Sequence, residues 1–419
     1  MRMIDPDERW GVRMAGPCVS RRGALNGGAA LFAWSFLPRV ASAAGARDPR
    51  LVVVILRGAL DGMSAVAPTG DPDYVALRES IALTTSGDRP ALPLDGFFAL
   101  HPAMPSFARQ YKQGHATVVH ACATPYRERS HFDGQDMLES GQPHVGPTDT
   151  GWLNRALAAL PQGDRVSIGG GLGVGLVTPL VLRGPAPVLG WAPPALPRAD
   201  DAIAARVLDL YTHRDPLLAD MLAKGLDTDR LASRAGMGNE RARGGADNAD
   251  GMKAIAAGAS RLLAQDEGPR LAALAFDGWD THANEGAATG RLAQLLGGLD
   301  GALAAFEDGL GERWKETVIV VATEFGRTAK VNGTVGTDHG TGTVAFLVGG
   351  AIRGGRVLAD WPGLKEAQLY EKRDLKPTTD LRAVFKGVLA DHLGMPPGLL
   401  ASRVFPESSK VAPLKGLIG

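Results

Sequence analysis

The sequence predicts an α/β fold, with a mostly parallel central sheet flanked by helices. Apolar runs rich in β-branched residues recur along the chain, and helical stretches lie between several of them. Runs that are apolar throughout are typical of strands covered on both faces. Carboxylates or imidazoles follow four of these runs. The chain of 419 residues, 45% of them hydrophobic, is long enough to bury a large core around such a sheet.

The expected strands are the apolar runs themselves, which lie at residues 50–58, 115–123, 270–276, 317–323 and 344–350. Helices are expected at 101–114, where Gly114 suits a C-terminal cap, and at 289–311. Between about 185 and 268 a proline-rich stretch precedes segments rich in Ala and Leu. We interpret this region as a helical insertion within a single α/β domain that spans residues 44–419.

Composition excludes some classes of partner. Lys plus Arg equals Asp plus Glu, at 45 each, so the chain has no net field that would recruit nucleic acid or an acidic membrane. The 55 glycines and 28 prolines exceed average usage but are too few for a low-complexity chain. The composition therefore favours a globular protein with many tight turns and no nucleic-acid partner.

The N-terminal segment has the features of an export signal. Arg21 and Arg22 precede a mostly apolar stretch that ends in the small residues Ala-Ser-Ala at 41–43. This pattern resembles a twin-arginine signal, so residues 1–43 are predicted to engage the twin-arginine translocase and then to be removed. A membrane anchor or an ordinary first helix is the alternative, but glycines and Pro38 interrupt an apolar stretch too short for a span.

The mature chain is therefore expected to be periplasmic or secreted. No later segment has the length and apolarity of a stable membrane span. Cys18 lies in the predicted signal, and Cys122 alone cannot form an intrachain disulfide. Stability must then come from the core, with bound metal as an addition.

Polar groups that can bind metals or react follow the predicted strands. Ligands in open α/β sheets gather beyond the carboxyl ends of strands, so residues distant in sequence can meet at one sheet edge. The expected metal ligands are Asp61, Asp280, His282, Glu324, Asp338 and His339. The expected catalytic residues are Ser130, His131, Arg129 and Arg327.

Carboxylates and imidazoles without thiols suit zinc, manganese, magnesium or calcium, and the imidazoles favour zinc. Adjacent Asp338 and His339 can ligate two ions, or one ion and its outer shell. Gly336 and Gly340 permit a tight backbone path. We expect the strand at 317–323 to deliver Glu324 to the sheet edge and a glycine hairpin to fold Asp338 and His339 back towards it.

Each group also has a plainer interpretation. Asp61 before a glycine is an ordinary turn residue, and the Asp-Thr-His sequence at 280–282 can be a helix N-cap. Glu324 with Arg327 can be a surface ion pair, and Ser130 can cap the helix that follows it. Four such clusters after four strands favour a site over these separate roles.

The motifs LRGALDG, RSHFDGQDMLE, GWDTH, TEFGRT and GTDHG occur in this order from about residue 51 to 405. Together with the N-terminal signal, they resemble the bacterial domain-of-unknown-function family 1501 (DUF1501). That family is similar to the alkaline phosphatase and sulfatase superfamily. The resemblance implies an alkaline-phosphatase-like α/β domain with a metal centre at the strand ends, in which Asp61 matches the first-strand aspartate.

The chain also departs from that superfamily. Phosphatase relatives carry Asp-His directly after the strand that here ends in TEFGRT, so Glu324 stands where an aspartate is usual. The sulfatase pattern of Cys or Ser followed by X-Pro-X-Arg is absent. Ser130 at a helix N-terminus is the best nucleophile, since backbone N–H groups there favour an anion.

The resulting hypothesis is an exported metal-dependent hydrolase of phosphate or sulfate esters. The metals would activate Ser130 or a water, and Arg129 and Arg327 would bind the ester oxygens. His131 would be a ligand or a general acid. The alternative is a noncatalytic exported protein that keeps its metal for structure and binds a cell-surface polymer or a protein. A sugar-phosphate mutase is less favoured, because an exported enzyme rarely meets such substrates.

Overall fold

The computed structural model describes residues 47–160, 170–193, 201–234 and 246–419. Within these ranges the main feature is a nine-stranded sheet in the order β11-β5-β10-β9-β1-β8-β6-β7, with β12 also pairing with β5. Its strands are β1 (Arg50–Leu56), β5 (Ala116–Ala123), β6 (Gly171–Val174), β7 (Val188–Trp191), β8 (Leu271–Phe276), β9 (Thr317–Thr323), β10 (Thr343–Val348), β11 (Arg356–Leu358) and β12 (Thr379–Asp380). All five strands expected from the sequence are present.

The sheet is mixed, which corrects the expectation of a mostly parallel sheet. β1 pairs in parallel with β8 and β9, so that Val53 lies between Ala273 and Val320. β10, however, runs antiparallel to both β9 and β5. The apolar run that forms β10 has the composition of a buried strand in either direction, so its sequence alone does not set its orientation.

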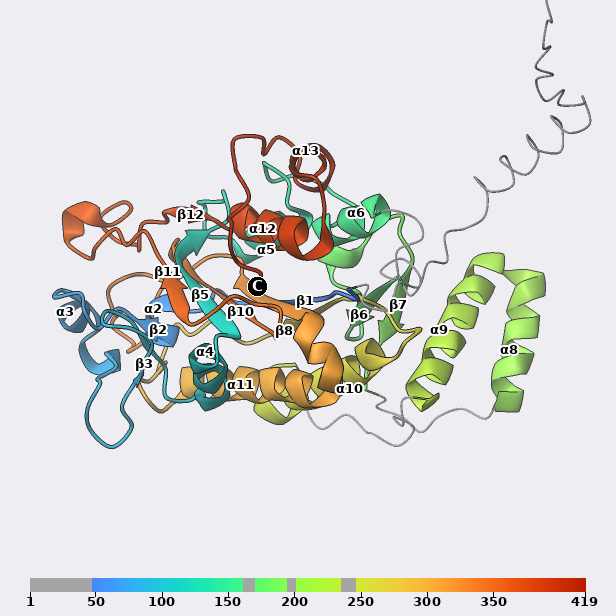
Figure 1. The fold of residues 1–419 in the computed structure, drawn as a ribbon, viewed down its shortest axis with the longest axis horizontal. Helices are drawn as coiled ribbons and strands as arrows, with labels where there is room; N and C mark the ends of the chain where they lie inside the picture. Colours follow the sequence, from blue (N-terminus) through green and yellow to red (C-terminus); the bar gives the residue numbers. More distant parts are fainter. Residues whose placement is uncertain (1–46, 161–169, 194–200, 235–245) are drawn as a thin grey trace, which may run out of the picture. The chain divides into compact units, whose positions relative to one another are not determined.

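Helices cover both faces of this sheet (Figure 1). The described α-helices are α2 (Gly62–Ala65), α3 (Tyr74–Arg78), α4 (Pro105–Lys112), α5 (His131–Ser140), α6 (Trp152–Ala159), α8 (Asp201–Arg214), α9 (Pro216–Arg234), α10 (Ala249–Ala264), α11 (Arg291–Leu310), α12 (Leu381–Leu393) and α13 (Pro397–Leu399). A second, three-stranded sheet has the order β2 (Val66–Ala67), β4 (Ala99–Leu100), β3 (Leu92–Pro93).

Strand β1 shows why its sequence forms a central strand. All seven of its residues are buried. Val52 and Val54 pack in one core with residues of α4, α10 and α11, whereas Val53 and Ile55 pack in a second core with residues of α6 and α12. Each fully buried Val or Ile contributes about 1.5–3 kcal/mol, so a strand that is apolar on both faces is stable only between two helical layers.

The carboxyl ends of β1, β8 and β9 lie at the same edge of the sheet, because the three strands are parallel neighbours. β10 is antiparallel to β9, so the connection at 324–342 starts and ends at this edge as well. The single reversed strand therefore places the glycine-rich segment beside the ends of the parallel strands. This arrangement positions the polar groups discussed below.

Helices α8, α9 and α10 lie in the region where the sequence suggested a helical insertion, which also contains β7. No helix of the described residues is both long and apolar enough to cross a membrane. The predicted signal at residues 1–43 lies outside the described residues. Cys122 in β5 is buried and unpaired.

Candidate metal centre

Polar side chains from four segments meet at the edge where the central strands end. The residue at the start of α5, the loop after β8, the residue after β9 and the β9–β10 connection each contribute. The members of this cluster are His131, Asp280, His282, Glu324, Asp338 and His339. Six residues that the sequence analysis proposed for a site are thus in one network of contacts.

The ligand atoms of His131, Asp280 and His339 lie within 4.8 Å of one another and can hold a metal ion. The Nε2 atoms of His131 and His339 are 2.9 Å apart, and Asp280 lies 3.3 Å from His339 Nε2 and 3.4 Å from His131 Nε2. His282 adds a third imidazole, with its Nε2 2.9 Å from His339 Nε2 and 3.1 Å from Asp280 Oδ1.

The other ring nitrogen of each histidine contacts an oxygen that can only accept. His131 Nδ1 lies 2.8 Å from Glu324 Oε1, and His282 Nδ1 lies 3.3 Å from Asp338 Oδ1. His339 Nδ1 lies 3.0 Å from the backbone carbonyl of Arg129. In the neutral rings the proton therefore sits on Nδ1, and each Nε2 presents its lone pair to the centre of the cluster.

This tautomer pattern fits a bound cation. Two Nε2 lone pairs that face each other at 2.9 Å repel, unless a proton or a metal ion lies between them. Two ligands of a tetrahedral ion bound at about 2.0–2.1 Å are about 3.3 Å apart, close to the separations observed here. Histidines that donate through Nδ1 to a carboxylate or carbonyl are the usual arrangement around a protein-bound metal.

Arg327 orients the carboxylate of the cluster. Its buried guanidinium donates to Asp280 Oδ1 at 2.5 Å and also to the carbonyl oxygens of Ala59 and Thr337. Burial disfavours the charge on Asp280, but the Arg327 cation outweighs it and lowers the pKa of Asp280. Asp280 is thus held ionised, as a metal ligand must be.

Glu324 orients His131. The carboxylate is fully buried and accepts from the backbone N–H of Gly58 at 2.8 Å as well as from His131. Burial raises the pKa of Glu324, but the hydrogen bonds with His131 and backbone N–H groups reverse this effect and lower it. The same hydrogen bond raises the pKa of His131, whereas burial lowers the pKa of His339.

The glycine-rich segment brings Asp338 and His339 into place. Arg327 and His339 form an antiparallel bridge, and Gly340 N–H donates to the Gly326 carbonyl at 2.8 Å. A Cβ at Gly340 would lie 2.3 Å from the Arg327 backbone, and one at Gly336 would lie 2.4 Å from the His282 backbone. These glycines permit the close backbone contact that the turn requires.

Asp61 is not placed in this cluster, although the sequence resemblance made it a metal ligand. It is buried at the N-terminus of α2, where Oδ1 accepts from the N–H groups of Met63 and Ser64 at 3.0 Å. Its Oδ2 pairs with the buried guanidinium of Arg78. A carboxylate that already accepts from these donors is satisfied without a metal.

The predicted catalytic residues fall into different surroundings. The Arg129 side chain points to Asp374 and Glu371, while its carbonyl accepts from His339. Ser130 precedes α5, but its side chain makes no capping hydrogen bond. Its backbone N–H donates to the Tyr126 hydroxyl at 3.1 Å.

Sequence reasoning missed residues that support the cluster, among them Asn332 and Gln135. Asn332 donates from its side chain to Asp338 Oδ1 at 3.0 Å, and this bond lowers the pKa of Asp338. Gln135, one turn after His131 in α5, donates to Glu324 Oε1 at 3.2 Å. The sequence signal for these two residues was their proximity to Asp338 and His131. An amide side chain in a loop or helix is too common for that proximity to indicate a role.

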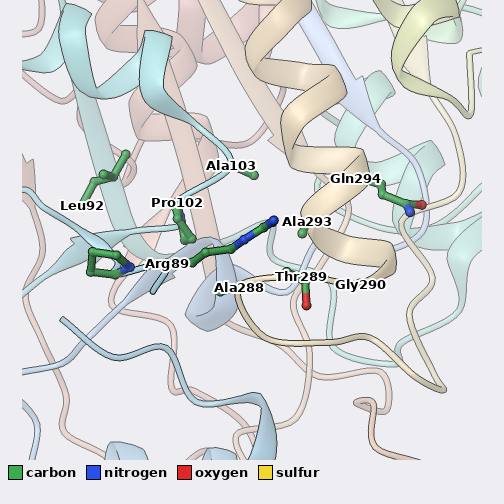
Figure 2. A pocket seen from close by; sticks show the side chains of 10 residues that line it. Arg89, Leu92, Pro102, Ala103, Ala288, Thr289, Gly290, Ala293 and Gln294 are labelled. Atoms are coloured by element: carbon green, nitrogen blue, oxygen red, sulfur yellow. The ribbon is translucent and has the colours of Figure 1, made fainter. Parts of the chain in front are cut away.

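A separate cavity of about 580 Å³ lies at the start of α11 (Figure 2). Its lining includes Arg89, Pro102, Thr289 and Gln294, and Arg89 extends towards Ala293. None of the six cluster residues lines it. The cluster itself is open to solvent, since the side chains of Asp280, His282 and Asp338 are 42%, 45% and 58% exposed.

The family model described as "Protein of unknown function (DUF1501)" matches residues 48–399, which is most of the chain. The chain belongs to the DUF1501 family. A comparison of this DUF1501 protein with curated proteins found no match.

Among solved structures, the DUF1501 protein is similar to the phosphonate monoester hydrolase of Agrobacterium radiobacter. The two share 11% sequence identity, and the match covers 83% of this chain and 74% of that chain at a TM-score of 0.33. This likeness is too distant to assign an activity to the DUF1501 protein.

Proposed function

We propose that this DUF1501 protein is an exported metal-dependent hydrolase of phosphate or sulfate esters. The observation that carries the proposal is the convergence of His131, Asp280 and His339, with His282 beside them, in a cluster open to solvent. Imidazole and carboxylate ligands of this kind favour zinc. A bound divalent ion supplies a Lewis acid that polarises an ester oxygen and lowers the pKa of a water.

The chain's own residues have defined tasks in this proposal. Glu324 and the Arg129 carbonyl fix the rings of His131 and His339, and such outer contacts also make the ligands more basic. Arg327 fixes the Asp280 carboxylate. The centre is therefore preorganised before substrate arrives, which reduces reorganisation during the reaction.

The proposal leaves two sources of nucleophile. One is a water activated at the centre. The other is Ser130, which adjoins His131 in sequence and whose hydroxyl does not cap the helix. A Ser130→Ala variant separates them, because only a serine nucleophile requires that hydroxyl.

An anionic ester also needs a cationic partner. The guanidinium of Arg327 is fully buried and donates to internal acceptors, and that of Arg129 pairs with Asp374 and Glu371. Arg373 donates to the His339 carbonyl and its Nε lies 3.2 Å from Asp374 Oδ1, but its side chain is 44% exposed, against 18% for Arg129. We therefore propose Arg373, rather than the two arginines expected from the sequence, as the residue that meets the ester anion.

The test is a metal and activity measurement on purified mature protein. Metal content is determined by elemental analysis, and hydrolysis of p-nitrophenyl phosphate and p-nitrophenyl sulfate is measured with and without a chelator. We expect bound metal and turnover of at least one ester that both the chelator and Asp338→Ala reduce. Stoichiometric metal without metal-dependent turnover of either ester would contradict the enzymatic proposal.

A noncatalytic metal protein is the second candidate, and His282 is the observation that favours it. If His131, Asp280, His282 and His339 all bind one ion, a four-coordinate site is closed, as structural zinc sites are. X-ray absorption on the metal-loaded protein counts the ligands. A water among the ligands supports the hydrolase, whereas four protein ligands and no water support the structural role.

Export through the twin-arginine translocase is part of the proposal and is tested separately. Replacement of Arg21 and Arg22 by lysine keeps the charge but removes the guanidinium pair. We expect the variant to remain in the cytoplasm with an uncleaved N-terminus, whereas the unchanged chain appears in the periplasm or medium. Equal export of both chains would contradict this route.

A further inference from the structure

Glu285 is a fully buried glutamate that the sequence analysis did not single out. It lies in the loop after β8, three residues beyond His282. Its Oε2 accepts from the Thr281 hydroxyl at 3.1 Å and from the Thr337 hydroxyl at 2.9 Å. Both threonines are themselves buried.

The two threonines are adjacent in sequence to proposed metal ligands. Thr281 stands between Asp280 and His282, and Thr337 immediately precedes Asp338 and His339. The two segments come from different connections of the sheet, one after β8 and one between β9 and β10. Glu285 is thus a single buried group that links the two segments.

Backbone contacts continue this link. Thr337 N–H donates to the Thr281 carbonyl at 3.2 Å, and Glu285 N–H donates to the Val335 carbonyl at 3.0 Å. The link also reaches α3, because Arg78 lies 3.7 Å from Glu285 Oε1 and pairs with Asp61. Asp61 is thereby connected to the same loops through Arg78.

Burial of a carboxyl group costs free energy unless hydrogen bonds or a cation compensate for its lost hydration, and burial accordingly raises the pKa of Glu285 to about 8. Glu285 Oε1 makes no hydrogen bond, so the side chain is not fully satisfied where it lies. Its two threonine contacts, by contrast, are both to segments that carry the proposed ligands. A carboxyl group retained in such surroundings fits a role in positioning.

We propose that Glu285 is a positioning residue of the metal centre, which sets the spacing between the Asp280–His282 segment and the Asp338–His339 segment through Thr281 and Thr337. This proposal rests on the proposed metal binding but not on hydrolysis. Its function is exerted through the threonines, since Glu285 does not contact the ligand atoms. Removal of the carboxylate should let the two segments separate and weaken the metal site.

The test measures zinc affinity by competition with a chromophoric chelator, together with the unfolding temperature of the metal-free protein. Glu285→Ala removes the acceptor of both hydroxyls, and loss of an outer-shell partner lowers metal affinity about 10–100-fold. Glu285→Gln keeps one acceptor oxygen and should restore most of the affinity. Asp300→Ala is the matched control, because Asp300 is a buried residue that accepts from the backbone N–H groups of Ser106 and Phe107 in the first turn of α4.

We expect Asp300→Ala to lower the unfolding temperature and leave zinc affinity unchanged, whereas Glu285→Ala lowers affinity. If Glu285→Ala does not fold, Thr337→Val and Thr281→Val take its place, since each removes one hydroxyl at nearly constant shape. Zinc affinity within twofold of the unchanged protein for the folded variants would overturn the positioning role. Failure of the unchanged protein to bind zinc, or any other divalent metal, would instead reject the proposed metal function.

Discussion

At the scale of single residues, the candidate metal centre depends on which nitrogen of each histidine carries the proton. Glu324, Asp338 and the Arg129 carbonyl each accept a hydrogen bond from an Nδ1–H group. The Nε2 atoms of His131 and His282 therefore both face Nε2 of His339. Sequence could identify the histidines, because each follows a predicted strand or begins a predicted helix. It could not identify these oxygen partners, one of which is a backbone carbonyl.

The first prediction concerns His339, whose Nε2 contacts both His131 and His282. His339→Ala should lower zinc affinity by more than the 10–100-fold typical of an outer-shell change, because it removes a proposed ligand itself. The measurement is chelator competition. His213→Ala is the control, because the His213 side chain on α8 is 73% exposed. This variant should bind zinc with unchanged affinity. Equal affinity of the two variants would exclude His339 as a ligand.

Asp61 lies outside the cluster that the sequence resemblance expected it to join. Its position after the first strand matched the family resemblance, and Asp-Gly is equally common in turns. The structure satisfies it instead with Arg78 and two backbone N–H groups. Arg78 lies in α3, in a stretch without a recognisable motif, so no sequence pattern indicated that a buried cation would meet this carboxylate.

At the scale of elements, strands were predictable and their directions were not. β1, β8 and β9 are apolar on both faces, and this pattern indicated buried strands. β10 has the same pattern but runs antiparallel. β6 and β7 were not predicted, because runs such as Gly-Leu-Gly-Val are short and rich in glycine. The segment that carries Asp338 and His339 lies at the carboxyl end of β9 because β10 runs antiparallel to β9, and the sequence does not determine that direction.

The end of β1 carries the second prediction. Gly58 has φ +119°, and a Cβ there would lie 2.5 Å from the Asp280 backbone nitrogen. Gly58→Ala should lower the free energy of unfolding by about 2–4 kcal/mol through backbone strain and overpacking. It should also weaken zinc binding, because the clash displaces Asp280. Chemical denaturation and chelator competition measure the two effects.

Gly87→Ala is the control that separates backbone strain from the steric clash with Asp280. Gly87 has φ +100°, yet nothing lies within 4 Å of an added Cβ. The control should therefore lose only about 1 kcal/mol from strain and should keep its zinc affinity. Similar losses in both variants would show that the contact between Gly58 and Asp280 does not constrain the site.

At the scale of the whole molecule, metal binding should stabilise the fold, because the cluster joins α5 to the loops that follow β8 and β9. A ligand that binds only the folded state at 100 times its dissociation constant adds about 2.7 kcal/mol. We expect zinc to raise the unfolding temperature and a chelator to reverse the rise. The His339→Ala variant should show little shift, and a full shift in that variant would place the bound ion elsewhere.

Acid should destabilise the folded chain through two buried histidines. His120 donates from Nε2 to the Val66 carbonyl and accepts at Nδ1 from Ala121 N–H, so the neutral ring is satisfied and a second proton has no acceptor. Burial lowers the pKa of His120 from 6.5 to about 4, and the pKa of His392 to about 4 in the same way. In the unfolded chain these rings protonate near pH 6.5.

The sign follows from where the protons bind. Below pH 6.5 the two histidines bind protons in the unfolded chain but remain neutral in the folded chain. The free energy of unfolding therefore keeps its full value above pH 6.5 and falls as the pH drops towards 4. Each histidine accounts for a loss of roughly 3 kcal/mol by pH 4. Urea unfolding of the metal-free protein at pH 7.5, 6 and 5 measures the loss. His120→Gln should lose about 2 kcal/mol less at pH 5, whereas the exposed His213→Gln should follow the unchanged protein. Parallel curves for all three proteins would show that His120 does not remain neutral in the folded chain.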